Sequence, residues 1–521
     1  MALAQTPFYV TMAAMASQQP KIDSVTPPHN RSIAWYAMFY WPLALTSVVG
    51  QVEGLYQNRI LASSPVAALA ERELAAYANA HSAYMMVTAF LAFIPQLVTV
   101  YGKTAADRRV CMRFTAACGM SLTVPLGFLA YTPLGEWWLR RGLSIPPDLL
   151  AHVQDYLSWL APLVLCVTAL QFITGRLVQA GRTRAITMFI LIHLAVLVIV
   201  LETLPRMSGN IEIRWMLAIA SLSANIIHVL AAGWYCRCLE KGDRGAPSAN
   251  AAGTANAADA ADAADAADAA VVVDAVDAAD TMDAAGVSGA AARSPLSGAV
   301  KPSDDARLTF SVLWAFFWPM AMTGLMFAMS RPIIFFFANR TAAALATVAA
   351  LRVAFDTGMF FQAPVNQFRH VYAQFGAVDP GGVRRFMLSV TGVFVGVMLL
   401  VALTPLSTLL FTGFLELPDE LIPPVRASFL VMCLGPAAIA IRNIFHGELI
   451  IRQKTRGMAG GGLFRIMAVV VFSAGGWFFG ALDHITGAAI MVLGFGFEAW
   501  GAHASMRRLV TRETNDCAPR D

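Results

Sequence analysis

Six ionisable side chains lie inside long apolar stretches of this sequence, where a charge is costly. They are Glu53, Arg331, Arg352, Asp356, Arg369 and Arg442. An arginine at the centre of a bilayer costs about 2.5 to 3.5 kcal/mol on insertion scales. We therefore expect each of these residues to face a cavity, a partner or the membrane interface.

The stretch around residue 365 carries the longest polar stripe. Gln362, Asn366 and Arg369 follow one another at i, i+4 and i+7, which is one face of a helix. Pro364 lacks an N–H and leaves a carbonyl free to face a cavity. Arg442 and His446 share a helix face in the same way. The predicted substrate-binding residues are Arg331, Arg369, Arg442, Asn366, Gln362 and His446, so the site is expected to lie mainly in the second half of the chain.

The coupling and gating residues are predicted to lie closer to the N-terminus and in one second-half helix. Glu53 shares a face with Gln57 and either binds a coupling proton or cation or holds Arg59 or an arginine of another helix. Asp356 follows Arg352 by four residues, so the two either neutralise each other or act on a solute. The predicted coupling and gating residues are Glu53, Asn58, Arg59, Asp356 and Pro364.

The arginines in apolar stretches outnumber the acids there. A guanidinium binds carboxylate and phosphate groups through two parallel hydrogen bonds. The excess therefore predicts a small anionic solute.

Composition assigns these residues to a membrane protein. The 521 residues are 57% hydrophobic and 13% charged, whereas soluble domains carry about 25% charged residues. Apolar stretches of about 20 residues recur along the chain, and within lipid such stretches must be helices. The prediction is an all-α polytopic membrane protein of about twelve helices. Its spans run near 33–61, 75–101, 110–131, 150–178, 184–204, 213–237, 309–338, 343–375, 383–410, 422–452, 457–479 and 484–507.

The spans divide into two groups of six. Residues 239–308 contain Ala-Ala-Asp repeats and almost no large apolar side chain, so a disordered linker is predicted between the halves. The predicted organisation is an N-terminal segment 1–32, a first bundle 33–238, the linker 239–308, a second bundle 309–508 and a tail 509–521. Basic residues gather in alternate loops, which predicts that both termini and the linker are cytoplasmic. The Ala/Asp repeats and the absence of a cysteine-pairing pattern favour a bacterial inner membrane.

The two groups repeat each other. Trp41-Pro42 matches Trp318-Pro319, and both helices lead to an Asn-Arg pair, Asn58-Arg59 and Asn339-Arg340. Further along, Pro95 matches Pro364, and Gly175 matches Gly447. Six spans is an even number, so the copies have the same orientation and form a parallel repeat. Transporters of this kind bind their solute between the halves.

Other classes of function lack support in the sequence. Gly102-Lys103-Thr104 resembles the end of a phosphate-binding loop, but position 97 is Leu and no nucleotide-binding domain surrounds it. We expect no enzyme activity, cofactor, metal or nucleic acid. Gly392-x-x-x-Gly396 permits close helix contact but is weak evidence for a dimer, so a monomer in the lipid bilayer is expected.

Several stretches resemble the progressive ankylosis protein family, within the superfamily of multidrug and toxin extrusion (MATE) transporters and polysaccharide flippases. The resembling stretches are Glu53 with Asn58-Arg59, Leu74-Ala-Ala-Tyr77, Ser330-Arg331-Pro332-Ile333, Arg369-x-Val-Tyr372, Arg442 to Gly447, Phe464-Arg465-Ile466 and Gly487-Ala488. The sequence departs from the family at Phe335-Phe336-Phe337, where the family is more polar.

The resemblance implies a MATE-like fold and export of pyrophosphate, nucleotides such as ATP, or citrate. The favoured hypothesis is a secondary-active transporter that exports such an anion by alternating access. Two alternatives are a proton- or sodium-coupled exporter of organic cations and a flippase for a lipid-linked anionic headgroup.

Overall fold

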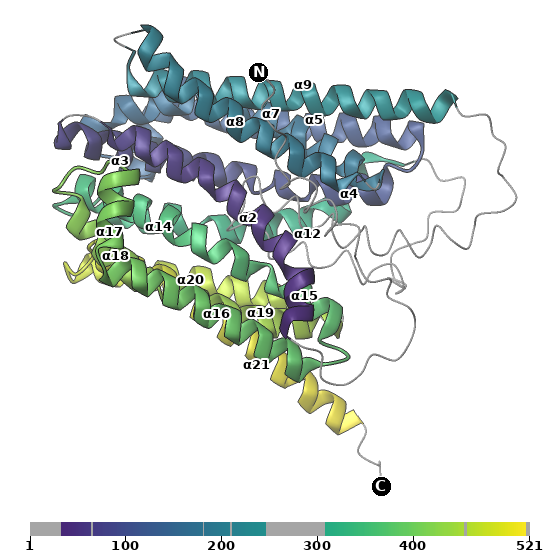
Figure 1. Cartoon of the computed structure of the whole chain (residues 1–521). Helices are drawn as coiled ribbons and strands as arrows, with labels where there is room; N and C mark the ends of the chain where they lie inside the picture. The colour runs from purple at the N-terminus through teal and green to yellow at the C-terminus, as the bar shows by residue number, and fades with distance from the viewer. Residues whose placement is uncertain are drawn as a thin grey trace, which may run out of the picture.

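The computed structural model describes residues 33–63, 66–180, 182–208, 211–245, 308–452 and 456–516. Within these ranges the regular structure is entirely helical, and the helices run roughly side by side (Figure 1). Residues 1–32 and most of the predicted linker lie outside the described residues.

The first half contains six long helical stretches. The first is α2 (Ile33–Ala62), and the second combines α3 (Ala67–Thr88), the short turn η1 (Leu91–Phe93) and α4 (Ile94–Tyr101). The others are α5 (Ala105–Tyr131), α7 (Pro147–Gln179), α8 (Thr183–Ser208) and α9 (Ile213–Gly245). A short helix, α6 (Pro133–Gly142), joins α5 to α7.

The second half repeats this order. Its first two spans are α12 (Phe310–Ala328) with α13 (Ser330–Ala338), and α14 (Ala344–Asn366) with α15 (Phe368–Phe375). α16 (Pro380–Leu403) follows, then α17 (Leu406–Thr408) with the π-helical turn η3 (Leu409–Phe414). The remaining spans are α18 (Ile422–Met432) with α19 (Gly435–Ile451), α20 (Arg456–Phe478) and α21 (His484–Asp516).

Hydropathy located the spans well. Ten helical stretches among the described residues are long and apolar enough to cross a bilayer, and α2 and α12–α13 occupy the first position of each half. The predicted all-α membrane fold is therefore confirmed. Two predicted boundaries differ: α9 continues to Gly245 and α21 to Asp516, beyond the predicted limits at 238 and 508.

The short helices α6 and η3 were not predicted. In α6, Trp137 and Trp138 are half-exposed and Arg140 and Arg141 follow them. This mixture of aromatic and basic side chains suits the membrane–water interface better than a span. The two helices hold equivalent positions, after the third span of each half.

The helices define two faces of the molecule. The termini face contains the first residues of α2 and the last residues of α21, and the distal face contains the opposite helix ends (right and left in Figure 1). Lys103, Arg108 and Arg109 lie at the termini face, in and after the turn between α4 and α5.

Prolines break the second span of each half. The helix that begins as α3 is interrupted after Thr88 and restarts as α4, with Pro95 in its first turn. In the second half, Pro364 lies near the end of α14, and the break falls at Gln367. Because proline cannot donate the ladder hydrogen bond, it produces a kink at these positions.

A glycine in the fourth span lets that broken helix approach closely. A Cβ atom on Gly175 would lie 2.8 Å from the Pro95 carbonyl oxygen and from the Val98 Cβ. A Cβ atom on Gly447 would lie 2.6 Å from the Tyr372 Cβ. The repeated Gly175 and Gly447 therefore have the same packing task in each half.

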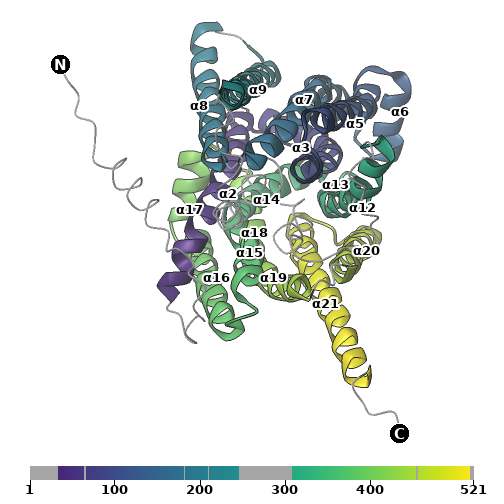
Figure 2. The ribbon, with the colours of Figure 1, turned by 90° about the vertical axis from the view of Figure 1, so that its right-hand side faces the viewer.

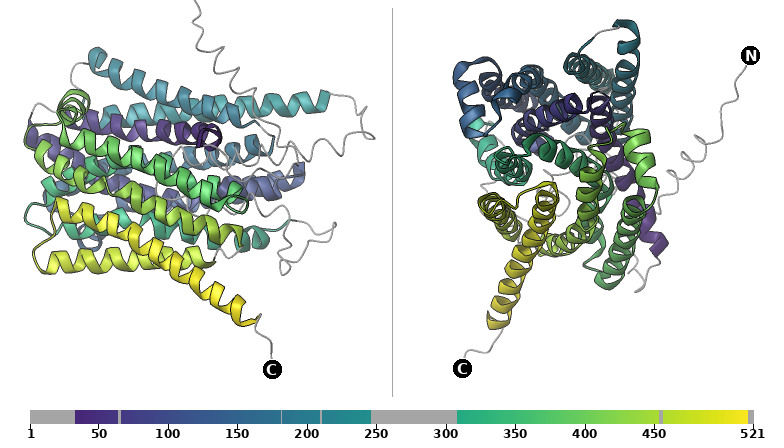
Figure 3. Two further views of the ribbon diagram at one scale, coloured as in Figure 1. Left: turned by 60° about the horizontal axis from the view of Figure 1, so that its bottom comes forward. Right: turned by 90° about the vertical axis from the view of Figure 1, so that its left-hand side faces the viewer.

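The first helix of each half packs on the other half at the termini face. Trp35 and Tyr36 of α2 contact Phe375 of α15, at ring-centroid distances of 4.6 and 5.8 Å. Phe317 of α12 contacts Phe114 of α5 at 5.6 Å. The view along the helices shows α12 and α13 beside first-half helices, and α2 beside α16 (Figure 2). The right panel of Figure 3 shows the bundle from the opposite end. The halves are therefore interleaved through their first helices.

The packing of Gly175 and Gly447 can be tested directly. Gly175→Val and Gly447→Val should each destabilise the protein by about 1–3 kcal/mol, since the added atoms overfill a close contact. Gly392→Val and Gly396→Val are matched controls, because a Cβ at either position meets nothing within 4 Å. Thermal unfolding of the detergent-purified protein measures the effect. Equal unfolding temperatures for the two pairs of variants would contradict this account.

Candidate functional site: a polar cavity between the two halves

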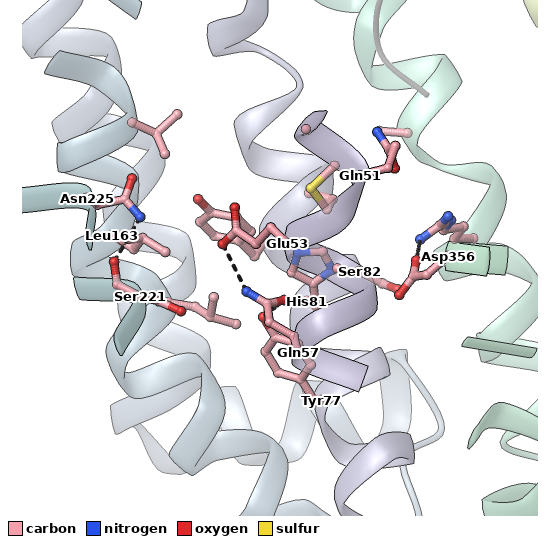
Figure 4. Close-up of a pocket in the computed structure, with 18 of the residues that line it drawn as sticks. Gln51, Glu53, Gln57, Tyr77, His81, Ser82, Leu163, Ser221, Asn225 and Asp356 are labelled. Atoms are coloured by element: carbon pink, nitrogen blue, oxygen red, sulfur yellow. Dashed lines mark hydrogen bonds and ion pairs between the residues drawn. The ribbon is translucent and has the colours of Figure 1, made fainter. Parts of the chain in front are cut away.

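A cavity of about 110 Å³ lies between α2, α3, α7, α8 and α9 of the first half and α13 and α14 of the second. Most of its lining comes from the first half. Figure 4 shows Glu53 and Gln57 in its centre, Ser221 and Asn225 on one side and Asp356 on the other. The polar and ionisable side chains of its wall are Gln51, Glu53, Gln57, Tyr77, His81, Ser82, Tyr84, Trp159, His193, Ser221, Asn225, Arg331 and Asp356.

A hydrogen-bonded chain joins α2 to its first-half neighbours. Gln57 Nε2 donates to Glu53 Oε1 at 3.0 Å, and the Tyr77 hydroxyl donates to Gln57 Oε1 at 2.9 Å. His193 Nε2 lies 3.3 Å from Glu53 Oε2. Glu53 thus has a polar contact on each carboxylate oxygen while it faces the cavity.

Asp356 gathers partners from three helices. Arg331 Nη1 donates to one of its oxygens at 2.7 Å, and Asn58 Nδ2 donates to the other at 2.9 Å. Arg352 Nη2 lies 3.4 Å from the same second oxygen. The predicted i, i+4 pair of Arg352 and Asp356 is therefore confirmed, but Asp356 is shared with a second arginine.

Asn58 completes this group from the other half of the molecule. Its Oδ1 accepts a hydrogen bond from Arg352 Nε at 2.8 Å, so the amide bridges the arginine and the carboxylate. The Arg352 guanidinium also lies 4.4 Å from the centre of the Tyr77 ring. We call Arg331, Arg352, Asp356 and Asn58 the Asp356 cluster; it contains two guanidiniums and one carboxylate.

A second charged group is buried inside the second half. Arg442 of α19 and Arg465 of α20 lie 3.5 and 3.4 Å from Glu498 of α21. Phe327 and Phe495 enclose the Arg465 guanidinium at 4.1 and 4.2 Å. These three charged side chains are at most 2% exposed.

The polar side chains near this group bind carbonyls at helix breaks. Gln362 Nε2 donates to the Met432 carbonyl, next to the break between α18 and α19. Asn443 Nδ2 donates to the Val365 carbonyl at 2.8 Å, next to the break between α14 and α15. Asn366 accepts from Arg442 Nη2 at 2.7 Å. A buried carbonyl without a donor is costly, so these amides stabilise the broken helices.

The structure therefore separates the predicted site residues. Arg331, Glu53 and Asp356 line the cavity, and Asn58 binds Asp356. The predicted residues in the second-half interior are Gln362, Pro364, Asn366, Arg369, Arg442 and His446, and none of them contributes to the described cavity wall. Arg59 lies at the distal end of α2, where it binds Glu416 and Glu202 at 2.7 and 3.3 Å.

Sequence reasoning missed several residues of both groups. Tyr77, His81 and Trp159 line the cavity, and Arg465 and Glu498 belong to the buried second-half group. The signal for Glu498 was present, because an acid within an apolar helix is costly without a partner. Among the described residues, no cluster of three or more His, Cys, Asp or Glu side chains is arranged to hold a metal ion.

No protein-family model and no curated protein matches the sequence. Solved structures do match over nearly the whole chain. A multidrug resistance MATE family transporter in an inward-facing conformation matches with a TM-score of 0.59 and 11% identity, covering 92% of this chain and all of the other. In an outward-facing conformation, a transporter of the same description gives 0.51 and 12%, covering 93% and 99%.

The Lipid II flippase MurJ in an inward closed conformation matches with a TM-score of 0.58 and 11% identity. The alignment covers 90% of this chain and 87% of the flippase. At these identities the matches show a shared fold. The chain thus has the fold of MATE transporters and of the MurJ flippase, with two six-helix halves around a polar cavity.

Proposed function

We propose that the protein is a secondary-active transporter that moves a small anion through the cavity by alternating access of its two halves. The Asp356 cluster is the observation that carries this proposal. Two guanidiniums contact one carboxylate there, and Arg331 also faces the cavity. The shared fold with MATE transporters supports the transport mechanism, and a bacterial inner membrane with both termini in the cytoplasm agrees with the basic residues at the termini face.

In the proposed mechanism the solute competes with Asp356. A carboxylate or phosphate entering the cavity binds Arg331 through two parallel hydrogen bonds, as guanidinium geometry favours. Asp356 then loses one of its two cationic partners. Because Asn58 of the opposite half is bound to the same carboxylate, solute binding changes a contact between the two halves.

Citrate, pyrophosphate and ATP are the solutes to examine first. Each carries several carboxylate or phosphate groups, and the sequence resemblance points to the same three. We propose export as the direction, by one copy of the chain acting alone.

Glu53 is the proposed coupling site. Its carboxylate faces the cavity and contacts His193 and Gln57. These two side chains stay beside the carboxylate when it binds a proton or a sodium ion. Asn58, Arg59 and Pro364 are proposed to take part in gating. Gln362, Asn366, Arg369, Arg442 and His446 are proposed to stabilise the broken helices of the second half.

A second candidate is a proton- or sodium-coupled exporter of organic cations. The specific observation in its favour is that Glu53 and Asp356 line the cavity beside the aromatic rings of Tyr77, Tyr84 and Trp159. Carboxylates and aromatic faces both attract cations. Export of a cationic dye from proteoliposomes, inhibited by Glu53→Gln, would favour this candidate.

The anion site can be tested by replacing Arg331. Arg331→Gln should lower anion counterflow in proteoliposomes by roughly 10- to 150-fold, the equivalent of a lost charged hydrogen bond of about 1.5–3 kcal/mol. Radiolabelled citrate, pyrophosphate and ATP are the probes. Arg206→Gln is the matched control, because Arg206 is 75% exposed and lies away from the cavity. Wild-type counterflow in Arg331→Gln would refute the assignment.

Coupling can be separated from exchange with Glu53→Gln. The amide keeps the shape of the side chain but cannot take up a proton or hold sodium by charge. We expect exchange of solute for solute to continue, while uphill accumulation driven by an imposed proton or sodium gradient is lost. Uptake against a gradient at the wild-type level would show that Glu53 is not the coupling residue.

A further inference from the structure

The two Asn-Arg pairs lie toward the distal ends of the first spans, and the second pair stands one helical turn further along its half than the first. Asn58 and Arg59 are at the end of α2, and Asn339 and Arg340 follow the end of α13. These helices are the first spans of the two halves. Each pair reaches across to the opposite half.

The two arginines bind equivalent loops. Arg59 Nη2 and Nε donate to Glu416 Oε1 at 2.7 and 3.0 Å, and Glu416 lies between η3 and α18 of the second half. Arg340 Nε donates to the Ser144 hydroxyl at 2.7 Å, and Ser144 lies between α6 and α7 of the first half. Both loops connect the third and fourth spans.

The two acceptors share an uncommon backbone conformation. Ser144 has φ of 56° and Glu416 has φ of 52°, and within the described ranges they are the non-glycine residues with positive φ. This left-handed region is unfavourable for residues with a Cβ atom and persists only where the surroundings impose it. In both halves the arginine thus binds a residue with left-handed backbone.

The asparagines cross between the halves as well. Asn339 Nδ2 donates to Asn79 Oδ1 of α3 at 2.7 Å. Asn58 binds Asp356 and Arg352 of α14. Each Asn-Arg pair therefore contacts the opposite half through both of its side chains.

We propose that the two Asn-Arg pairs are the arms of a lock that closes the distal face, and that releasing the lock opens the cavity to that face. This inference rests on the proposed function, because it assumes alternating access. The first arm connects the lock to the solute site, since Asn58 belongs to the Asp356 cluster. When a solute draws Arg331 from Asp356, the contact that holds Asn58 changes with it.

The arms differ in chemistry. The first is an ion pair with Glu416, whereas the second is a charge-assisted hydrogen bond to the uncharged Ser144 hydroxyl, with the Arg340 guanidinium 3.9 Å from the Phe336 ring centre. Partly exposed ion pairs are individually weak and are screened by salt. The first arm should therefore open more readily at high ionic strength than the second.

Hydrogen–deuterium exchange of the full chain in lipid nanodiscs tests the lock without any solute. The variants are Glu416→Gln, Ser144→Gly and the double variant. Each single change should speed exchange at the distal ends of α2 and α13 by up to about fivefold, the effect of one exposed polar pair, and the double variant should exceed both. Glu202→Gln is the matched control, because Glu202 is the partner of Arg59 within its own half.

The Ser144→Gly variant separates the lock from local strain. Glycine removes the hydroxyl but suits the left-handed backbone, so a purely local effect would slow exchange in its loop. Wild-type exchange in the double variant, or equal effects of Glu416→Gln and Glu202→Gln, would overturn the lock. Faster exchange in a protein that shows no solute flux would instead refute the proposed function and leave the lock standing.

Discussion

The packing of the two halves around the cavity depends on one carboxylate, Asp356, which binds side chains of both halves. Its oxygens contact Arg331 and Arg352 of the second half and Asn58 of the first. Leaving any of these charges alone inside a bilayer would be costly, so the three helices must stay together while the pairing holds. In the proposed mechanism the same sharing makes the group responsive, because an anion that binds one arginine changes the contacts of the others. The cavity and the interface between the halves meet at this residue, and Asn58 connects it to Arg59 at the distal end of α2.

The two halves share their architecture and differ in their chemistry. In both, a proline breaks the second span and a glycine of the fourth span lets it approach, at Gly175 and Gly447. The first half uses its interior for a polar cavity. The second fills the corresponding space with the Arg442, Arg465 and Glu498 group, enclosed by aromatic rings. The two halves thus repeat one helical arrangement and differ in the polar side chains of their interiors.

Hydropathy and internal repeats predicted most of this frame, because span length and proline chemistry are properties of local sequence. The charged pairs were harder to predict. Spacing along one helix revealed the pair of Arg352 and Asp356. In contrast, Arg331 of α13 binds Asp356 of α14, and Arg442 of α19 binds Glu498 of α21, so these pairs join different helices. The prediction of a second-half site rested on the number of arginines there. Their carboxylate partners lie on other helices and could not be identified from spacing along one helix. The cavity is lined mainly by first-half residues, and the amide of Gln362 instead donates to the Met432 carbonyl at a helix break.

Binding of the solute to Asp356→Asn tests the central claim most directly. Asparagine keeps the size of the side chain but removes the negative charge that competes for Arg331. If an anion and Asp356 compete, calorimetric titration of the purified variant with citrate, pyrophosphate or ATP will show tighter binding than the wild type, although transport is arrested. Weaker anion binding by Asp356→Asn would contradict the account, because it would mean that Asp356 assists the site.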